Sequence, residues 1–513
     1  MRRHTVLTAL TGLSLALAGC SGPGVAPGPG GSAPAGANPD ATLVVGITTD
    51  PNNLNPWKAT QFQSVHVLET MYSSLTAFDK DLKVVPALAE SWTTSADGKT
   101  VTLKLRSGVT FADGSAFDSA DVKFSLDKVK DKATAAVAAA SLASVTQVTA
   151  KDPSTVELAL SAPDAALPSN LASLNLAILP SEATEETFTS KPNGTGAFSY
   201  VSRTPNQSLT VQRNPKYWGE PAKAAKVEFR VIPEEAAIVS AVQSGNVHIA
   251  GLKDPLIAKN AATAKVEVLR TPQLSYHVLQ LNATRGALTD LNVRLAIQCG
   301  IDRQQVLDTA ALGEGEVTGP NTSPLFKSDP QARPCPTRDV ARAKEYLAQA
   351  GRPQVTIKTI VSTGEYATSV NEAQNLKAQL GEVGITLELE TLESGAYVTK
   401  WVAADFEAAV ALNGGRPDPD GAYSRYFTSQ GNLNKVAGYS SPTLDNLFAQ
   451  GRTTTDEQAR KEIYRSVDAE LENNAVWVWL FTGYGYTVTG KGVTGFVPNP
   501  TGSFRSLSTT AVS

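Results

Sequence analysis

The residue with the clearest chemical setting is Cys20. It follows Leu17-Ala18-Gly19 and ends a short apolar run that begins after Arg2 and Arg3. A basic start, an apolar segment too short to span a bilayer, and small residues before a cysteine predict a secretory signal with lipoprotein cleavage. We therefore expect residues 1–19 to form a signal peptide and Cys20 to carry the lipid. The alternative is an ordinary signal peptide in which the cysteine occurs by chance.

The segment after Cys20 predicts a flexible tether. Ser21 to Asn38 consists almost entirely of Gly, Pro, Ala and Ser and carries no charge. Such a composition does not fold by itself, because it buries too little apolar surface. We expect residues 20–40 to hold the rest of the chain at the extracytoplasmic face of the cell membrane through the lipid anchor.

Two further cysteines remain, Cys299 and Cys335. In the oxidising compartment outside the membrane, a disulfide is the default state of such a pair. We predict a Cys299–Cys335 bridge, and the alternative is two buried free thiols.

Other reactive groups give little sign of catalysis. None of the four histidines has a second His or Cys at metal-ligand spacing, and His277 alone does not make a nickel site. Asp418 and Asp420 are an acidic pair, but their proline context favours turn capping over glycoside hydrolysis. No nucleophile stands with a base in a recognisable arrangement. We expect no enzyme activity, no cofactor and no metal.

The overall composition sets limits on the class of protein. The chain has 513 residues, of which 18% are charged, and its formal net charge is −4. It offers no basic surface for nucleic acid, and no second apolar run reaches the ~18 residues of a membrane span. The residues that remain after the tether are too many for one hydrophobic core, so we expect two or three domains.

Helical and strand patterns alternate along the chain. Apolar residues recur at three- and four-residue spacing from Phe62 to Leu75, which predicts a helix with one apolar face. Further helices are expected at residues 118–128, 233–243, 290–300, 339–350, 366–383, 441–447 and 456–471. Strands are expected at residues 41–45, 101–105, 145–149, 155–160, 209–212, 227–231, 356–361 and 386–392. This order indicates open α/β domains with sheets covered by helices.

Several short stretches follow one another in a fixed order between about residues 42 and 500. They are Pro86–Trp92, Leu103–Gly114, Ala120–Ser125, Gly194–Phe198, Arg213–Gly219, Val293–Ile297, Ile301–Arg303, Ala341–Gly351, Asp418–Asp420 and Gly438–Asp445. Each stretch alone is plausible as a turn or core segment, but in their common order and spacing they resemble the family 5 extracellular solute-binding proteins of ABC importers. This family includes dipeptide-, oligopeptide- and nickel-binding lipoproteins.

The resemblance implies an α/β fold of two lobes, a type II periplasmic-binding-protein-like clamp joined by two crossovers. Lobe I would span residues 42–271, with an extra subdomain at 57–191, and lobe II residues 272–483. Residues 484–513 would return to lobe I. The resemblance also implies a monomer that closes around a small solute and docks on ABC permease subunits.

Residues that bind the solute should come from loops and strand ends that face the cleft. The candidates lie after the first strand, just past the first crossover, at Trp401, and in the loop ahead of Asp418. They are Phe62, Gln63, Tyr276, His277, Trp401, Asn413, Gly415, Arg416 and Asp418.

The loop ahead of Asp418 limits the choice of solute. Peptide binders of this family typically place an aspartate shortly before the Asp-Pro element, where it pairs with the α-ammonium of the peptide. Asn413-Gly414-Gly415-Arg416-Pro417 contains no carboxylate. A buried ammonium without a partner costs roughly several kcal/mol, so a dipeptide with a free amino terminus is disfavoured. Arg416 would instead meet a carboxylate or phosphate of the solute, or cap the loop.

A peptide nevertheless remains the first hypothesis for the solute. An opine or an oligosaccharide is the alternative within transport. A lipoprotein that senses a solute and reports to a signalling partner needs the same closure, so the sequence does not separate it from an importer component. An extracellular hydrolase built on this scaffold is the least favoured reading.

Overall fold

The structure is a computed structural model that describes residues 40–51, 53–364 and 366–513. The expected signal peptide, the lipidated Cys20 and all of the expected tether except Asp40 lie outside these residues.

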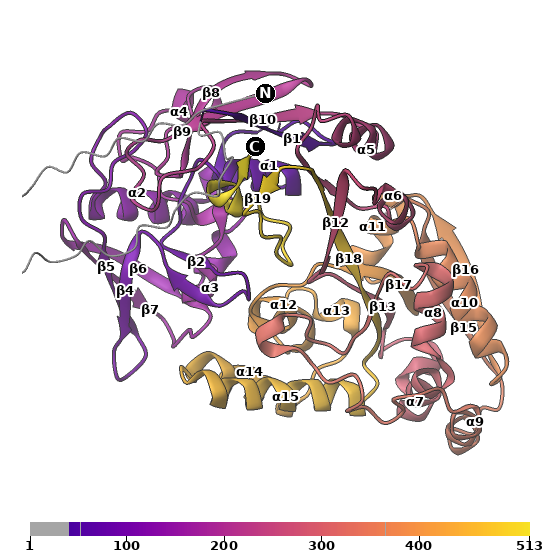
Figure 1. Cartoon of the computed structure of the whole chain (residues 1–513). Helices are drawn as coiled ribbons and strands as arrows, with labels where there is room; N and C mark the ends of the chain where they lie inside the picture. The colour runs from indigo at the N-terminus through magenta and orange to yellow at the C-terminus, as the bar shows by residue number, and fades with distance from the viewer. Residues whose placement is uncertain (1–39, 52, 365) are drawn as a thin grey trace, which may run out of the picture. The chain divides into compact units, whose positions relative to one another are not determined.

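A mixed sheet of twelve strands runs through the described chain (Figure 1). Two of its strands, β12 (Val266–Pro272) and β14 (Gly315–Val317), pair only with β18. The other strands, in spatial order, are β16 (Ile385–Leu392), β15 (Val355–Ser362), β17 (Ala408–Asn413), β13 (Tyr276–Leu281), β18 (Trp477–Gly490), β11 (Ile249–Leu252), β1 (Thr42–Ile47), β10 (Lys226–Val231), β9 (Ser208–Arg213) and β8 (Phe198–Thr204).

Strand β18 lies in the middle of this sheet and joins its two halves. Its first part, Trp477–Phe481, pairs antiparallel with β13, and its second part, Tyr484–Gly490, pairs antiparallel with β12. Side chains alternate between the two faces of a strand, and in the first part Trp477 and Trp479 enter one apolar cluster while Val478 and Leu480 enter another. Both faces are covered, which explains why the first part of β18 is apolar without interruption.

The buried apolar residues form four clusters that fall into two groups. Two clusters draw on residues between Leu43 and Val266 and again on residues from Tyr486 onward. The other two draw on residues between Tyr276 and Phe481. We call the first group of elements lobe I and the second lobe II. The exact lobe and subdomain boundaries expected from the sequence stay predictions.

Lobe I contains three smaller sheets. A four-stranded antiparallel sheet has the order β4 (Ala89–Thr94), β5 (Thr100–Leu105), β7 (Thr155–Leu160) and β6 (Val145–Asp152). The two-stranded sheets are β2 (Thr76–Phe78) with β3 (Val84–Pro86), and β19 (Val493–Thr494) with β20 (Ala511–Val512).

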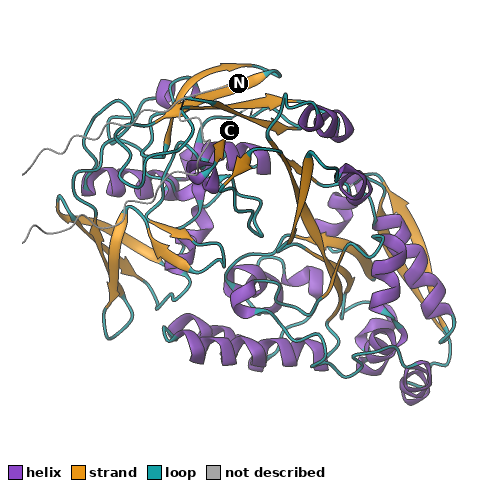
Figure 2. Cartoon of the chain, viewed as in Figure 1, coloured by secondary structure: helices purple, strands orange, loops and turns teal. Residues whose placement is uncertain are grey.

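Helices pack beside these sheets, and Figure 2 shows their distribution. In lobe I they are α1 (Phe62–Leu68), α2 (Ser119–Lys130), α3 (Leu167–Asn170), α4 (Glu185–Thr189), α5 (Glu235–Gln243) and α6 (Pro255–Ala261). In lobe II they are α7 (Leu291–Gly300), α8 (Arg303–Ala310), α9 (Val340–Gln349), α10 (Ser369–Gly381), α11 (Ser394–Ala403), α12 (Pro419–Phe427), α13 (Asn434–Ala437), α14 (Pro442–Thr453) and α15 (Glu457–Asn473).

The expected helix from Phe62 is shorter than its apolar pattern. It ends at Leu68, and the carbonyl groups of residues 70 and 71 then accept hydrogen bonds from the distant Phe198 and Gly196 amides instead of continuing the helix. Met71 O accepts a hydrogen bond from the Gly196 amide at 2.9 Å. A Cβ atom at either Gly194 or Gly196 would overlap the Met71 carbonyl group. These glycines therefore permit a close approach of two backbones.

The structure joins Cys299 and Cys335 by a disulfide, with 5.1 Å between their Cα atoms. Cys299 lies near the end of α7, and Cys335 precedes α9. Both side chains belong to the same apolar cluster of lobe II.

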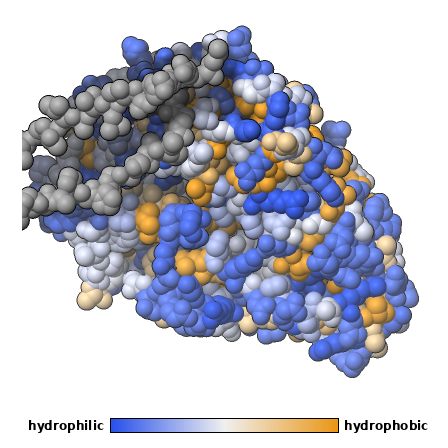
Figure 3. Space-filling view, in the orientation of Figure 1, coloured by the Kyte–Doolittle hydropathy of each residue, from blue (hydrophilic) through white to orange (hydrophobic). Residues whose placement is uncertain are grey.

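In Figure 3 polar residues predominate on the visible face and apolar ones are scattered. None of the helices formed by the described residues is both long and apolar enough to cross a bilayer.

Candidate functional site

Two of the candidate residues meet across neighbouring strands of lobe II. β13 and β17 pair antiparallel in a register that places Tyr276 opposite Asn413. The Asn413 amide nitrogen donates to the Tyr276 hydroxyl at 3.3 Å. Burial is the main cause that raises the pKa of Tyr276, so its hydroxyl stays protonated.

Gln280, which the sequence analysis missed, extends this contact to Trp401. Its amide nitrogen donates to Asn413 Oδ1 at 3.2 Å, and its Oε1 accepts from Trp401 Nε1 at 2.6 Å. Gln280 is completely buried, and a buried amide of this kind needs partners for both its ends. Tyr276, Asn413, Gln280 and Trp401 thus form a continuous hydrogen-bonded chain, which we call the polar row.

His277 lies on the opposite face of the sheet from the polar row. Successive residues of a strand point to opposite faces, and the His277 ring stacks on Phe481 at a centroid distance of 4.1 Å. Its Nδ1 lies 2.8 Å from Oε1 of the buried Glu372 in α10. The structure therefore does not bring His277 together with Tyr276.

The candidates at the start of α1 belong to lobe I. Phe62 is the first residue of this helix. Gln63 donates to Thr48 Oγ1 at 2.5 Å and accepts from the Thr49 amide at 2.6 Å. The Gln63 side chain thus fixes the loop that leaves β1, and it stands apart from the polar row.

The loop between β17 and α12 packs against the segment that leads into β13. A Cβ atom at Gly415 would overlap the Leu274 carbonyl oxygen, whereas a Cβ at Gly414 would meet nothing within 4 Å. Gly415 is thus required for a close backbone approach. The loop that carries Arg416 therefore lies directly on residue 274, between β12 and β13.

Asp418 and Asp420 have separate partners, as the expectation of turn capping requires. Asp418 accepts from the Asp420 amide at 3.0 Å and begins α12 as its N-cap. Arg460 of α15 binds both oxygens of the Asp418 carboxylate. Asp420 pairs with Arg452 Nε at 2.9 Å. Burial is the main cause that raises the pKa of Asp420 to about 6.

Arg416 lies along the first turns of α12. A Cβ atom at Gly421 would stand 3.4 Å from Arg416 Cδ and 3.7 Å from Nη1. Arg425 follows Gly421 by one helical turn, and its guanidinium lies 4.7 Å from the centre of the Tyr426 ring. Arg416 is exposed as a residue, but partial removal of its guanidinium from water, and then the charge of Arg425, lower its pKa. Tyr426 also packs edge-on to Trp401, with ring centres 6.4 Å apart.

The two lobes touch at a hinge and at a distant contact. At the hinge, Thr482 Oγ1 of β18 donates to Gln273 O at 2.6 Å, and the Gln273 amide donates to Gly483 O at 3.0 Å. At the distant contact, the Ala165 amide of lobe I donates to Arg452 O at the end of α14, at 2.7 Å. The second contact joins elements of the two lobes outside the segments that connect them.

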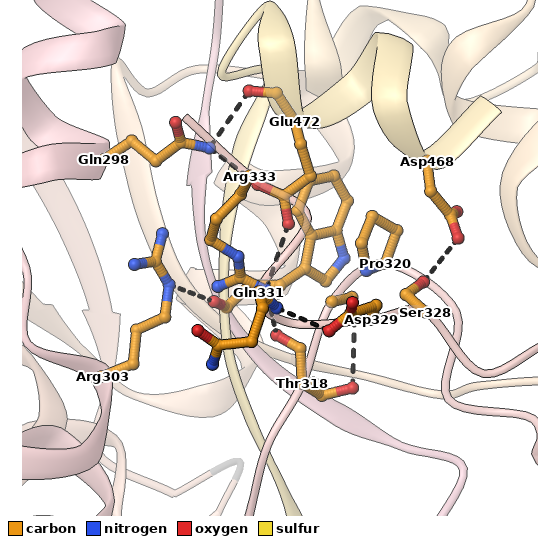
Figure 4. A network of polar contacts seen from close by, with 12 residues as sticks. Gln298, Arg303, Thr318, Pro320, Ser328, Asp329, Gln331, Arg333, Asp468 and Glu472 are labelled. Atoms are coloured by element: carbon orange, nitrogen blue, oxygen red, sulfur yellow. Dashed lines mark hydrogen bonds and ion pairs between the residues drawn. The ribbon is translucent and has the colours of Figure 1, made fainter. Parts of the chain in front are cut away.

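A buried polar network holds α15 in lobe II (Figure 4). Arg333 Nη2 lies 3.3 Å from Glu472 Oε1, and Gln298 donates to Glu472 Oε2 at 2.7 Å. Arg303 donates to the Trp479 carbonyl at 3.0 Å, and Ser328 donates to Asp468 at 2.6 Å.

Burial governs the charges of this network. It raises the pKa values of Asp468 and Glu472 and, with the charge of Arg333, lowers the pKa of Arg303 to about 9. Because the network joins α7, α8, α15 and β18, we assign it a structural role.

The described residues contain no group of three or more His, Cys, Asp or Glu side chains placed to hold a metal ion. The candidate residues instead bring together hydrogen-bonding groups, arginines and aromatic rings.

Comparison with known families gives a match over most of the chain. The model of the bacterial extracellular solute-binding proteins, family 5, matches residues 83–434. The glutathione-binding protein GsiB of Pectobacterium atrosepticum is 27% identical over 498 residues, which cover 91% of this chain and 93% of GsiB.

Solved structures of similar fold cover almost the same part of the chain. The periplasmic binding protein AgaA of A. tumefaciens R10, in complex with agropinic acid, has a TM-score of 0.75 and 26% identity, covering 92% of this chain and 99% of AgaA. HbpA2 of Haemophilus parasuis has a TM-score of 0.84 and 22% identity, covering 92% of this chain and 100% of HbpA2. The two-lobe α/β fold expected from the sequence is confirmed.

Proposed function

Because the chain belongs to the family 5 bacterial extracellular solute-binding proteins, we propose that it captures a small solute by closure of its two lobes and delivers it to an ABC-type permease. The solute we propose first is a peptide or a peptide-like molecule. We further propose that the protein acts as a monomer, held at the outer face of the membrane by a lipid on Cys20.

One observation carries the proposal for the binding site. The loop that bears Arg416 packs through Gly415 on Leu274, which lies between β12 of lobe I and β13 of lobe II. At its other end the loop continues β17, where Asn413 belongs to the polar row. A solute that contacts this loop therefore also acts on the segment around Leu274, which must bend when the lobes move.

Closure needs contacts that exist only when the lobes meet. The hydrogen bond from the Ala165 amide to Arg452 O is one such contact, and the ion pair of Lys83 with Glu457, at 3.7 Å and exposed, is a second and weaker one. A solute held by both lobes would shift the equilibrium between open and closed forms toward the closed one.

The relatives guide the choice of solute. GsiB is named for binding glutathione, which is a peptide, and AgaA was solved with agropinic acid. The second of these favours an opine-type solute as the alternative candidate. Both names point to small solutes that resemble amino acids or peptides, which is why we rank them above oligosaccharides.

Native mass spectrometry of residues 39–513, followed by denaturation, tests this proposal by identifying any solute released. A small peptide or an opine would support it, and small-angle scattering should then show that the solute makes the protein more compact. A purified protein that carries no solute, and that no member of a peptide, opine and sugar library stabilises, would contradict it. Uptake of the identified solute by cells lacking this protein then separates import from sensing, since a sensor leaves uptake unchanged.

A further inference from the structure

We infer that Arg416 and Arg425 form a binding subsite for a carboxylate group of the solute. This inference rests on the proposed function, because it names the chemical class of solute that the same site accepts. It assigns the acidic end of the solute, instead of an α-ammonium, as the group that the loop before α12 recognises.

The first support is the geometry of the two arginines. Gly421 has no side chain, and Arg416 occupies the space beside it, with its Nη1 3.7 Å from the position of a Cβ there. Arg425 stands four residues after Gly421 in α12, so it extends from the same side of the helix one turn later. The two guanidinium groups are therefore neighbours.

The second support is the balance of charge around them. No Asp or Glu among the described residues forms an ion pair with Arg416 or Arg425. The acids nearest in sequence are already engaged, Asp418 by Arg460 and Asp420 by Arg452. Two neighbouring cations without an anion repel each other, which agrees with the lowered pKa of Arg416.

The third support is an unsatisfied hydrogen-bond donor. Arg425 Nε is buried and has no acceptor within the described residues. A buried donor without a partner costs free energy that an acceptor on a ligand would recover. One carboxylate placed between the arginines would accept from both and would offset their repulsion.

The chemistry of the arginines and of their surroundings favours a carboxylate. Guanidinium groups match the two oxygens of a carboxylate with paired, charge-assisted hydrogen bonds. The buried Tyr426 ring lies under the Arg425 guanidinium and packs against the partly buried Trp401, so the arginines stand next to an aromatic group. The loop from Asn413 to Pro417 has no carboxylate that could hold an ammonium.

Matched pairs of solutes test this inference. Calorimetry and thermal shift would compare Ala-Ala-Ala, Ala-Ala-Glu and γ-Glu-Ala, each as the free acid and as the full amide, on the wild-type protein. We expect the acids to bind and the amides to bind at least ~10-fold more weakly, because a charge-assisted hydrogen bond is lost. Equal binding of acid and amide would overturn the inference while leaving the proposed function intact.

Variants of the arginines provide the second arm. Arg416→Gln and Arg425→Gln should each weaken binding of the acids about 10- to 100-fold, with little effect on the amides. Arg342→Gln, on the exposed side of α9, makes the same change of charge and should bind like wild type. Without solute, both site variants should melt at or above the wild-type temperature, since a repulsion is removed. Acids bound as tightly by the Arg416→Gln/Arg425→Gln double variant as by wild type would overturn the inference.

The remaining outcome separates the two proposals. If no acid of the panel and no library member stabilises the wild-type protein, the proposed function fails and this inference fails with it. If the protein binds only solutes without a carboxylate, the solute-binding function stands and the carboxylate subsite is wrong.

Discussion

Arg460 of α15 donates one hydrogen bond to each oxygen of Asp418, with distances of 2.5 Å from Nη1 to Oδ2 and 2.9 Å from Nη2 to Oδ1. Asp418 is at the same time the N-cap of α12. This pair therefore fixes the start of the helix that carries Arg425 and the end of the loop that carries Arg416.

Arg460→Met should destabilise the protein by about 3–5 kcal/mol, because it leaves the buried Asp418 carboxylate without its partner. The double variant Asp418→Asn/Arg460→Met should lose less, since asparagine keeps the helix cap and no charge stays unpaired. Urea unfolding measures both. Lys461→Met, the next residue of α15, breaks only a partly exposed pair with Glu457 and should cost at most about 1 kcal/mol. Equal losses for Arg460→Met and Lys461→Met would contradict the role of the pair.

Gly415→Ala should destabilise the protein by about 1–3 kcal/mol, because its Cβ would overlap the Leu274 carbonyl and force two backbones apart. Gly414→Ala is the matched control: its Cβ meets nothing, so its effect should stay within about 0.5 kcal/mol. The free energies of unfolding in urea check both values. The same substitution at Gly415 should also weaken solute binding, and unchanged affinity would show that the loop does not act on the segment around Leu274.

Replacing both cysteines of the disulfide by alanine should lower the free energy of unfolding by about 4 kcal/mol. This value follows from the chain-entropy model for a loop closed between residues 36 apart in sequence. Thiol titration of the unfolded, unreduced residues 39–513 should find no free thiol. Two thiols per chain would show that Cys299 and Cys335 are reduced in the protein as isolated.

The pH dependence of stability should report on Asp420. Its pKa is about 6 in the folded protein and 3.8 for the ordinary side chain. As the pH rises, Asp420 therefore loses its proton at a lower pH in the unfolded chain than in the folded protein. The stabilisation that the protonated Asp420 provides below pH 3.8 declines as the pH rises to about 6.

Asp420→Asn removes this titration. Relative to Asp420→Asn, the wild-type protein should lose about 3 kcal/mol between pH 3.5 and pH 7, mostly between pH 4 and 6. The charge of Asp420 also interacts with Arg452, Asp418 and Asp164. None of these three residues is substituted in either protein of the comparison. Parallel pH profiles for the two proteins would contradict the raised pKa.

Cys20→Ser should move the protein from the membrane fraction to the medium or the periplasm, because no lipid is then attached. Fractionation of cells that express each form measures the distribution. Wild-type protein found entirely in the soluble fraction would support the alternative of an ordinary signal peptide. Binding of solute by residues 39–513 should be the same in either case.

The sequence predicts local elements well where their signals are local. Asp118 and Asp121 form the capping box that begins α2, and the alternating residues of β5 face in and out as expected. The helix from Phe62 was predicted too long, because its end depends on Gly196 from a distant segment. Local periodicity contains no information about such a partner.

Local sequence patterns predict even less about which residues of the candidate site come together. Tyr276 and Asn413 were both among the candidates, but their contact follows from the register of β13 and β17, which are far apart in the chain. The register also places His277 on the other face. Gln280 and Arg425 were missed because each sits inside a regular element. Only the fold shows that Gln280 joins the polar row and that Arg425 lies one turn from Gly421.

Strand β18 has a consequence for how the chain reaches its folded state. It lies between β13 of lobe II and β11 and β12 of lobe I, yet it comes late in the sequence. Contacts between residues so far apart slow folding. Until β18 arrives, β13 and β11 each present an open edge that can pair with another chain. The newly made protein is therefore most prone to aggregate in this interval, and a chaperone that shields strand edges would protect it then.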